Sequence, residues 1–440
     1  MSEPRPGKHP ARPVVFLGAR LLDPARGLDA AGGLLVVDGR IAELGPGVGS
    51  GGLPEDAERI DCGGHCLAPG LIDMRVQLRE PGEEHKETIA TAAAAAAAGG
   101  VTTMVCLPNT DPAIDDVAGV EFIARRGREP RRAKVYCYGA ITKGLAGRDL
   151  VEMGLLAESG ALGFTDGLVA VADARVMRRA LSYAGAFDLL LIQHPEEPRL
   201  AEGGAMNEGE LSTRLGLAGI PAAAEAMIVE RDLRLVEPTG ARYHCAHVST
   251  AAALDVIRRA KARGSRVTCD TAPPYFALDE SAVGDYRSFA KLSPPLRGED
   301  DRRAVAAAVA DGTIDCIASD HAPHDQDSKR VPFAQAAAGI VGLETLLPLA
   351  LELYHKGEAK LLVLLKAMTA APADVLRLPQ GRLAEGAPAD LVLFDLDRPG
   401  RIDVDRFRSK SKNSPFDGRP VRGRVLRTVV DGRTVFTAEA

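Results

Sequence analysis

Short apolar runs separated by glycines fill both ends of the chain. Near the start they read VVFLGARLL (14–22), GLLVVDGRIAELG (33–45) and HCLAPG (65–70). Near the end, ADLVLFDLD (389–397) and GRVLRTVVDGRTVF (423–436) have the same texture. This pattern predicts β-strands joined by tight turns. We expect residues 1–66 and 385–440 to meet as the two parts of one small β-sandwich.

Between these ends, over residues 67–384, strand patterns alternate with helix patterns. TIATAAAAAAAGG (88–100) is a strong helix former stopped by glycines, and the apolar VTTMVCLPNT (101–110) follows it. Further apolar runs end in polar residues: AKVYCYGAIT (133–142), ALGFTD (161–166), FDLLLIQH (187–194), ARYHCAHVST (241–250), SRVTCDTAP (265–273), RSFAKLSPP (287–295) and TIDCIASDHAPH (313–324). Such alternation predicts an α/β fold, a (β/α)8 TIM barrel.

The first strand of this barrel, in APGLIDMRVQLREPG (68–82), carries an unusual polar row. Its polar members are Asp73, Arg75, Gln77 and Arg79, which alternate with Met74, Val76 and Leu78. Because successive side chains of a strand point to opposite faces, the four polar side chains are expected on one face.

Four strand ends carry groups that bind zinc or move protons. They are Asp166, His194, His247 and Asp320. Neutral imidazole and carboxylate oxygen are ordinary zinc ligands. TIM barrels place their chemistry at the C-terminal ends of their strands, so we expect these side chains to converge. Any one of them alone would more simply be a satisfied core or loop residue.

Composition narrows the class of protein. The 440 residues are 46% hydrophobic, enough for a large core, and the net charge of −6 is spread without a basic block that would indicate nucleic acid or an anionic membrane. No apolar run approaches the ~20 residues of a membrane span. The polar, proline-rich start is unlike a signal peptide, and seven scattered cysteines suit a reducing compartment. We expect a cytoplasmic protein.

Long specific segments resemble the bacterial dihydroorotases, a class related to allantoinases and hydantoinases in the amidohydrolase superfamily. The resemblance rests on APGLID, REPGEEHKETIATAAAAAAAGGVTTMVCLPNTDPAID, MNEGELSTRLGLAGIP, HVSTAAALDVIRRAKARG, SPPLRGEDDRRA, DGTIDCIASDHAPH, GIVGLETLLPLAL and RFRSKSKNSPFDG. It implies a (β/α)8 barrel with a small β-sandwich built from both termini.

The resemblance also implies roles for individual residues. Asp166 matches a carboxylate that bridges two zinc ions, and His194 and His247 match ligands of the second zinc. Asp320 matches the ligand of the first zinc that also serves as catalytic general acid/base. Three further positions match groups that hold the substrate: Arg79, Asn109 and His324.

The chain departs from the family at the first strand. The family's His-x-His metal pair stands here as Arg75 and Gln77, Ser293 replaces an asparagine, and TAPPYF replaces a Pro-His-His run. A guanidinium cannot coordinate a metal. We therefore expect one zinc ion at most, and none as the alternative. Our hypothesis is that Arg75 replaces the first zinc as counter-charge, with Asp320 as partner and Asp166 as a second one; the alternative is that Arg75 points to solvent.

Two functions follow from different classes. One is a dihydroorotase of pyrimidine biosynthesis with a defective or single-zinc site, which interconverts dihydroorotate and N-carbamoyl-aspartate. The other is a non-catalytic dihydroorotase-like subunit that scaffolds aspartate carbamoyltransferase. An allantoinase or hydantoinase is a third possibility, although Arg79 and Asn109 argue for a carboxylated substrate. A homo-oligomer is expected in each case.

Overall fold

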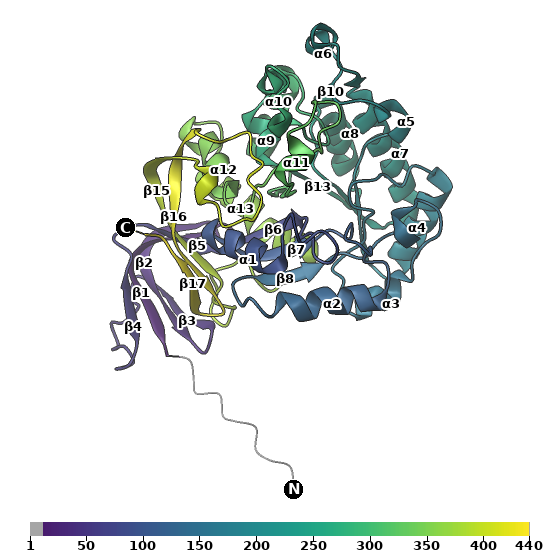
Figure 1. Ribbon diagram of the computed structural model, residues 1–440. Helices are drawn as coiled ribbons and strands as arrows, with labels where there is room; N and C mark the ends of the chain where they lie inside the picture. Colours follow the sequence, from purple (N-terminus) through teal and green to yellow (C-terminus); the bar gives the residue numbers. More distant parts are fainter. Residues whose placement is uncertain (1–11, 440) are drawn as a thin grey trace.

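The two ends of the chain build one sheet. The computed structural model describes residues 12–439, so residues 1–11, where the predicted sandwich begins, and residue 440 lie outside the described part. The sheet has eight strands in the order β17-β16-β15-β5-β1-β2-β3, with β4 paired to β1 (Figure 1). Their bounds are β1 (Val14–Asp23), β2 (Leu28–Val37), β3 (Arg40–Gly45), β4 (Glu58–Asp61), β5 (Cys66–Pro69), β15 (Leu391–Arg401), β16 (Pro420–Val430) and β17 (Arg433–Thr437).

Strand β5 joins the two ends because it lies between β1 and β15. It pairs in parallel with β1 and antiparallel with β15, with Leu393 opposite Leu67. Leu67 packs with Phe16, Leu34 and Leu391, all fully buried, in a core that draws on both ends of the sequence. Neither end alone supplies this apolar layer.

Eight parallel segments form the barrel. Seven are strands: β6 (Leu71–Val76), β7 (Val101–Cys106), β8 (Lys134–Cys137), β9 (Leu190–Gln193), β12 (Arg242–Cys245), β13 (Val267–Thr271) and β14 (Cys316–Ile317). The eighth is the single residue Phe164 of ALGFTD, which bridges Gly139 on one side and Leu191 on the other. A bridge between Val76 and His321 closes the ring. The predicted barrel is confirmed, but RSFAKLSPP is not a strand; it holds a short 3-10 helix, η3 (Ser288–Ala290).

Helices surround the barrel on its outer side (Figure 1). The α-helices are α1 (Ile89–Ala98), α2 (Val117–Gly127), α3 (Met153–Glu158), α4 (Ala174–Ala186), α5 (Pro198–Ala201), α6 (Glu210–Leu215), α7 (Ala223–Thr239), α8 (Ala251–Ala262), α9 (Pro273–Ala277), α10 (Glu299–Asp311), α11 (Gln326–Lys329), α12 (Leu346–His355), α13 (Leu361–Met368) and α14 (Ala370–Leu376). The remaining short elements are η1 (Lys143–Leu145), η2 (Glu280–Val283), η4 (Val404–Arg406), β10 (Met206–Asn207) and β11 (Gly219–Ile220). Within the described chain, no helix combines the length and apolarity needed to cross a membrane.

The alanine-rich helix α1 confirms the prediction for 88–100. Thr88 caps it by accepting a hydrogen bond from the Thr91 amide, and Gly99 ends it. The helix buries most of its alanines, and a Cβ on Gly99 would lie 2.0 Å from the carbonyl oxygen of Leu343. Small side chains are therefore required here because the backbones pack closely.

The polar row predicted for 68–82 is interrupted. Strand β6 ends at Val76, and only the Gln77 amide continues the ladder by donating to the carbonyl of His321. Arg79 has a φ of 60°, a left-handed conformation that does not belong to the extended backbone on which the alternation depends. The prediction holds as far as Arg75 and is wrong for Arg79.

Candidate functional site

Four buried side chains meet at the C-terminal ends of the barrel strands. They are Arg75 from β6, His194 after β9, His247 after β12 and Asp320 after β14. Arg75 is 2% exposed and His247 is fully buried. A charged guanidinium at this depth is costly unless the protein surrounds it with acceptors.

Arg75 has those acceptors. Its Nε donates to Oδ1 of Asp320 at 2.8 Å, and its Nη2 donates to the carbonyl of Gly167 at 3.3 Å. The same Nη2 lies 3.2 Å from Nε2 of His247. The predicted ion pair between Arg75 and Asp320 is confirmed, and the alternative in which Arg75 points to solvent is wrong.

His247 connects Arg75, Asp320 and His194. Its Nδ1 lies 3.1 Å from Oδ2 of Asp320, and its Nε2 lies 2.7 Å from Nδ1 of His194. Burial and the charge of Arg75 lower the pKa of His247 to about 4, so the ring is neutral at pH 7. One proton then suffices: placed on Nδ1 it is donated to Asp320, which leaves Nε2 as the acceptor.

Asp320 remains ionised in this surrounding. Burial alone would raise its pKa, but the charges and hydrogen bonds of His247 and Arg75 hold the pKa well below its usual range. The carboxylate is therefore fixed as an anion between a permanent cation and a neutral imidazole.

A second layer of buried groups fixes His247. Asp270 of β13 accepts a hydrogen bond from the His247 amide at 2.8 Å through Oδ1, and its Oδ2 lies 2.8 Å from Nε2 of His244. The ring of Tyr275 packs edge-on against His247 at 6.5 Å between centroids. His247 and Asp320 both have positive φ values, 35° and 52°, which the surrounding contacts must hold.

Asp166 has other partners than those predicted. Its Oδ1 accepts from the amides of Ile141 and Thr142 at 2.9 Å each, and its Oδ2 accepts from the Thr142 hydroxyl at 2.5 Å. Burial raises the pKa of this carboxyl. The prediction of Asp166 as a second partner of Arg75 is wrong, because the guanidinium reaches the carbonyl of the next residue, Gly167, instead.

The three residues predicted to hold substrate lie in two groups. Arg79 donates to the Pro323 carbonyl at 3.1 Å and to Glu83 at 2.7 Å, and its Nη2 lies 3.3 Å from Nε2 of His324. Asn109 instead donates from Nδ2 to Oε1 of Gln77 at 3.1 Å. The Arg79 fork is thus partly occupied by the protein itself.

His324 has one free ring nitrogen. Its Nε2 donates to the carbonyl of Ala338 at 2.9 Å, and its buried Nδ1 finds no partner among residues 12–439. Burial and the nearby Arg79 lower the pKa of His324 to about 3, which keeps Nδ1 unprotonated. This nitrogen is a buried acceptor without a protein donor in that part of the chain.

The arrangement does not fit the two-zinc centre that the resemblance implies. Two zinc-bound imidazole nitrogens at tetrahedral angles lie about 3.3 Å apart, since each bond is about 2.0–2.1 Å long. Nδ1 of His194 and Nε2 of His247 are only 2.7 Å apart, and an Arg75 nitrogen also faces Nε2. Among residues 12–439, no group of three or more His, Cys, Asp or Glu side chains is placed to hold a metal ion.

A chain of polar contacts that our sequence reasoning missed links the mouth to the C-terminal segment. Glu87 accepts from the hydroxyl of Ser409 and lies 3.5 Å from Nε2 of His321, the residue after Asp320. Asn413 accepts from the amide of His324 at 3.0 Å and donates to the carbonyl of Ala322 at 3.0 Å. The segments HKETI and RFRSKSKNSPFDG, both part of the family resemblance, carried the signal for these residues.

Comparison with known proteins gives relatives in sequence and in fold. A family model described as Dihydro-orotase-like matches residues 64–253. Similar proteins named Dihydroorotase include one from Anaplasma phagocytophilum, 49% identical over 97% of this chain and 96% of its own length, and one from Syntrophotalea carbinolica, 45% identical over 96% and 99%. Among solved structures, the L-hydantoinase (dihydropyrimidinase) of Arthrobacter aurescens superposes with a TM-score of 0.86 at 24% identity, covering 96% of this chain and 95% of its own, which shows the shared fold.

Proposed function

The chain belongs to the dihydroorotase family, and from that premise we propose that it serves pyrimidine biosynthesis as a dihydroorotase-type subunit whose barrel mouth is neutralised by Arg75 instead of by a first zinc ion. The observation that carries this proposal is the buried ion pair between Arg75 and Asp320 at 2.8 Å.

The ion pair determines what chemistry the mouth can perform. A zinc ion lowers the pKa of bound water from ~15.7 to about 7 and so supplies hydroxide at neutral pH. A guanidinium supplies the charge but has no coordination position for water. Asp320, paired with Arg75 and His247, is also a poor base, because its low pKa disfavours taking up a proton. The isolated subunit therefore interconverts dihydroorotate and N-carbamoyl-aspartate slowly at best.

In this role the barrel is a binding and assembly partner, in the cytoplasm, for the enzyme that makes N-carbamoyl-aspartate, an aspartate carbamoyltransferase. The barrel would still bind the ring or its opened form, through Arg79, Asn109 and the free Nδ1 of His324. We propose a homo-oligomer for the free subunit.

One observation favours a second candidate, a single-zinc dihydroorotase. Asp166, His194 and His247 all lie at the ends of neighbouring barrel segments, as in the zinc-binding relatives implied by the resemblance. Three protein ligands are a usual number for a catalytic zinc ion. This candidate requires Arg75 to leave Nε2 of His247 and the two imidazoles to move apart.

Zinc content and turnover separate the two candidates. Our proposal predicts well under one zinc ion per purified chain and turnover near background in both directions, together with co-elution with a carbamoyltransferase from the same organism. About one zinc ion per chain with chelator-sensitive turnover supports the second candidate instead. Two zinc ions with full turnover would contradict both.

The double variant Arg75→His with Gln77→His tests the mapping of β6 onto the metal site. It restores two imidazoles and removes the competing guanidinium, so zinc content should rise toward two per chain. Arg79→His, two residues further along but outside the row, is the matched control and should leave zinc content unchanged. If the double variant also binds no more zinc than the parent, the position of Arg75 has been misassigned.

A further inference from the structure

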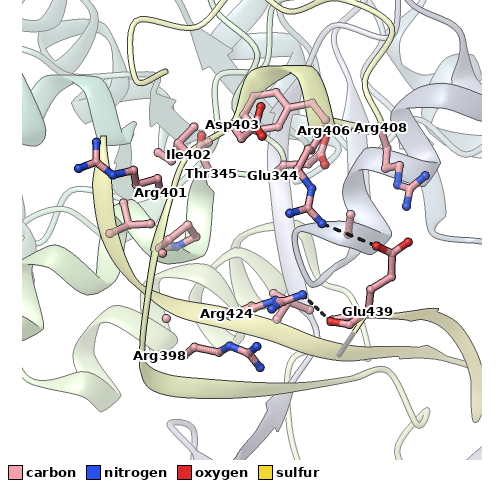
Figure 2. A pocket seen from close by; sticks show the side chains of 18 of the residues that line it. Glu344, Thr345, Arg398, Arg401, Ile402, Asp403, Arg406, Arg408, Arg424 and Glu439 are labelled. Atoms are coloured by element: carbon pink, nitrogen blue, oxygen red, sulfur yellow. Dashed lines mark hydrogen bonds and ion pairs between the residues drawn. The ribbon is translucent and has the colours of Figure 1, made fainter. Parts of the chain in front are cut away.

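A cavity lies beside the sheet that joins the two ends of the chain. Its volume is about 280 Å³, and its wall comes from the end of α1, the start of α12, the segment 398–408, and β16 and β17. None of the mouth residues described above lines it. Five arginines do: Arg398, Arg401, Arg406, Arg408 and Arg424 (Figure 2).

Most of the acidic groups on this wall are committed elsewhere. Glu344 accepts from the amides of Arg408 and Ser409 at 2.7 and 3.1 Å, and Asp403 accepts from the amide of Asp405 at 3.1 Å, where it caps η4. Both carboxylates therefore hold backbone, and the five arginines of the wall outnumber its three carboxylates, Glu344, Asp403 and Glu439, so the wall is positively charged.

The end of the chain already behaves as an oxygen ligand for two of these arginines. Nη2 of Arg424 donates to the main-chain oxygen of Glu439 at 2.6 Å, and Nη2 of Arg406 lies 3.7 Å from the Glu439 carboxylate. Figure 2 shows both guanidinium groups directed at Glu439. The two guanidinium groups thus contact two different oxygens of one residue, a main-chain oxygen and a carboxylate oxygen.

Beneath the arginines the wall is apolar. It consists of Pro348, Pro399, Ile402, Phe407, Val425 and Phe436. Ile402 and Val425 are buried, and Phe407 and Phe436 are half-buried. A cationic rim over an apolar, partly aromatic floor suits a ligand with a negatively charged head and a flat, weakly polar body.

We propose that this cavity, which we call the arginine pocket, binds a nucleoside monophosphate. Its phosphate displaces the Glu439 carboxylate from Arg406 and is shared with Arg424, because planar guanidinium groups match phosphate oxygens in pairs. The base lies on the floor formed by Ile402 and Phe436. The cavity volume is at the small end of the range for ligand sites, which suits a compact ligand. This site is independent of the barrel mouth and of the function proposed for it.

Calorimetry on the full-length protein tests the pocket, with AMP as the probe and adenosine and inorganic phosphate as its two halves. AMP should bind, phosphate should bind more weakly, and adenosine should show the weakest binding. Arg406→Ala and Arg424→Ala should each weaken AMP binding about tenfold, since each removes charged hydrogen bonds. Arg422→Ala, an exposed arginine of β16 that is not part of the wall, is the control and should change nothing.

Glu439→Gln gives an effect of opposite sign. It removes the competing carboxylate while keeping the chain length, so AMP should bind about twofold to fivefold more tightly, the range of an exposed ion pair. Three results overturn the proposal: no AMP binding up to about 1 mM, equal weakening by Arg422→Ala, or weaker binding in Glu439→Gln. AMP binding no tighter than phosphate overturns the nucleoside part and leaves an adventitious ion only.

Discussion

The two sides of the barrel mouth solve the same electrostatic problem differently. On the β9–β12–β13 side, imidazoles are present and a buried carboxylate holds the backbone of one of them, since Asp270 accepts from the His247 amide. On the β6 side, a permanent cation, Arg75, pairs with Asp320. The difference shows that a buried carboxylate at the mouth need not depend on a metal ion for its counter-charge, because a single guanidinium supplies the cation from within the chain.

Removing the cation on the β6 side should have the largest effect on stability. Arg75→Met leaves the Asp320 carboxylate buried without its cation, so the free energy of unfolding should fall by about 3–5 kcal/mol. Urea unfolding at pH 7 measures it. The control Arg234→Met, in an exposed pair with Glu230, should cost under about 1 kcal/mol. Adding Asp320→Asn to Arg75→Met should recover part of the loss; equal losses in the two arginine variants would contradict our account of Arg75.

Breaking the imidazole side should cost less, because no charge is left unpaired. Asp270→Asn keeps one oxygen for the His247 amide and weakens the contact with His244, for an expected loss of about 2–3 kcal/mol. Asp301→Asn, a half-buried carboxylate that caps the Ala251 amide, is the control at about 1 kcal/mol. A result in which Asp270→Asn exceeds Arg75→Met would reverse the comparison.

The pH dependence of stability tests the comparison further, because it depends on the pKa of His247. In the folded chain this pKa is about 4, below its ordinary value of 6.5, so the unfolded chain binds more protons between these pH values. The stability that the neutral His247 contributes is fully present above pH 6.5 and is lost as the pH falls. Between pH 7 and pH 5 this should lower the free energy of unfolding by about 2 kcal/mol. Nitrogen NMR of the ring should show a neutral His247 at pH 5. In Arg75→Met the pKa should rise, since the repelling charge is gone; an unchanged pKa would count against the contact.

The smallest effect on stability is expected at the contact between Asn109 and Gln77. Asn109→Ala removes one hydrogen bond to Gln77 in a half-buried position and should cost about 1 kcal/mol. Gln77→Ala should cost the same within error, because it removes the same bond. A much larger loss from Gln77→Ala would mean that this side chain has further partners at the mouth.

Local sequence patterns predicted the helices and strands, and the family resemblance predicted which distant segments of the chain meet. The helix at 89–98 followed from the alanine run stopped by glycines, and the strands at both ends of the chain followed from glycine-broken apolar runs. RSFAKLSPP misled because an apolar run alone does not distinguish a strand from an irregular packed segment. The ALGFTD segment contributes only Phe164 to the barrel, a detail that periodicity cannot resolve.

At the site, the counter-charge of Asp320 could be predicted from the sequence, but the partners of Asp166 and the position of Arg79 could not. The ion pair between Arg75 and Asp320 followed from the cost of a buried carboxylate without a cation. Asp166 could not be assigned in this way because two of its three partners are backbone amides, which every sequence offers. Arg79 was misplaced because its left-handed backbone is a property of the turn and not of the polar alternation.

The position of β5 between β1 and β15 sets an order for synthesis on the ribosome. All eight barrel segments and the His321 bridge that closes the ring lie within residues 71–321, so the barrel can close early. One edge of β5 stays uncovered until residue 391 and the strand that follows have left the exit tunnel. During that interval the nascent chain exposes an unpaired strand edge, the kind of edge through which polypeptides associate.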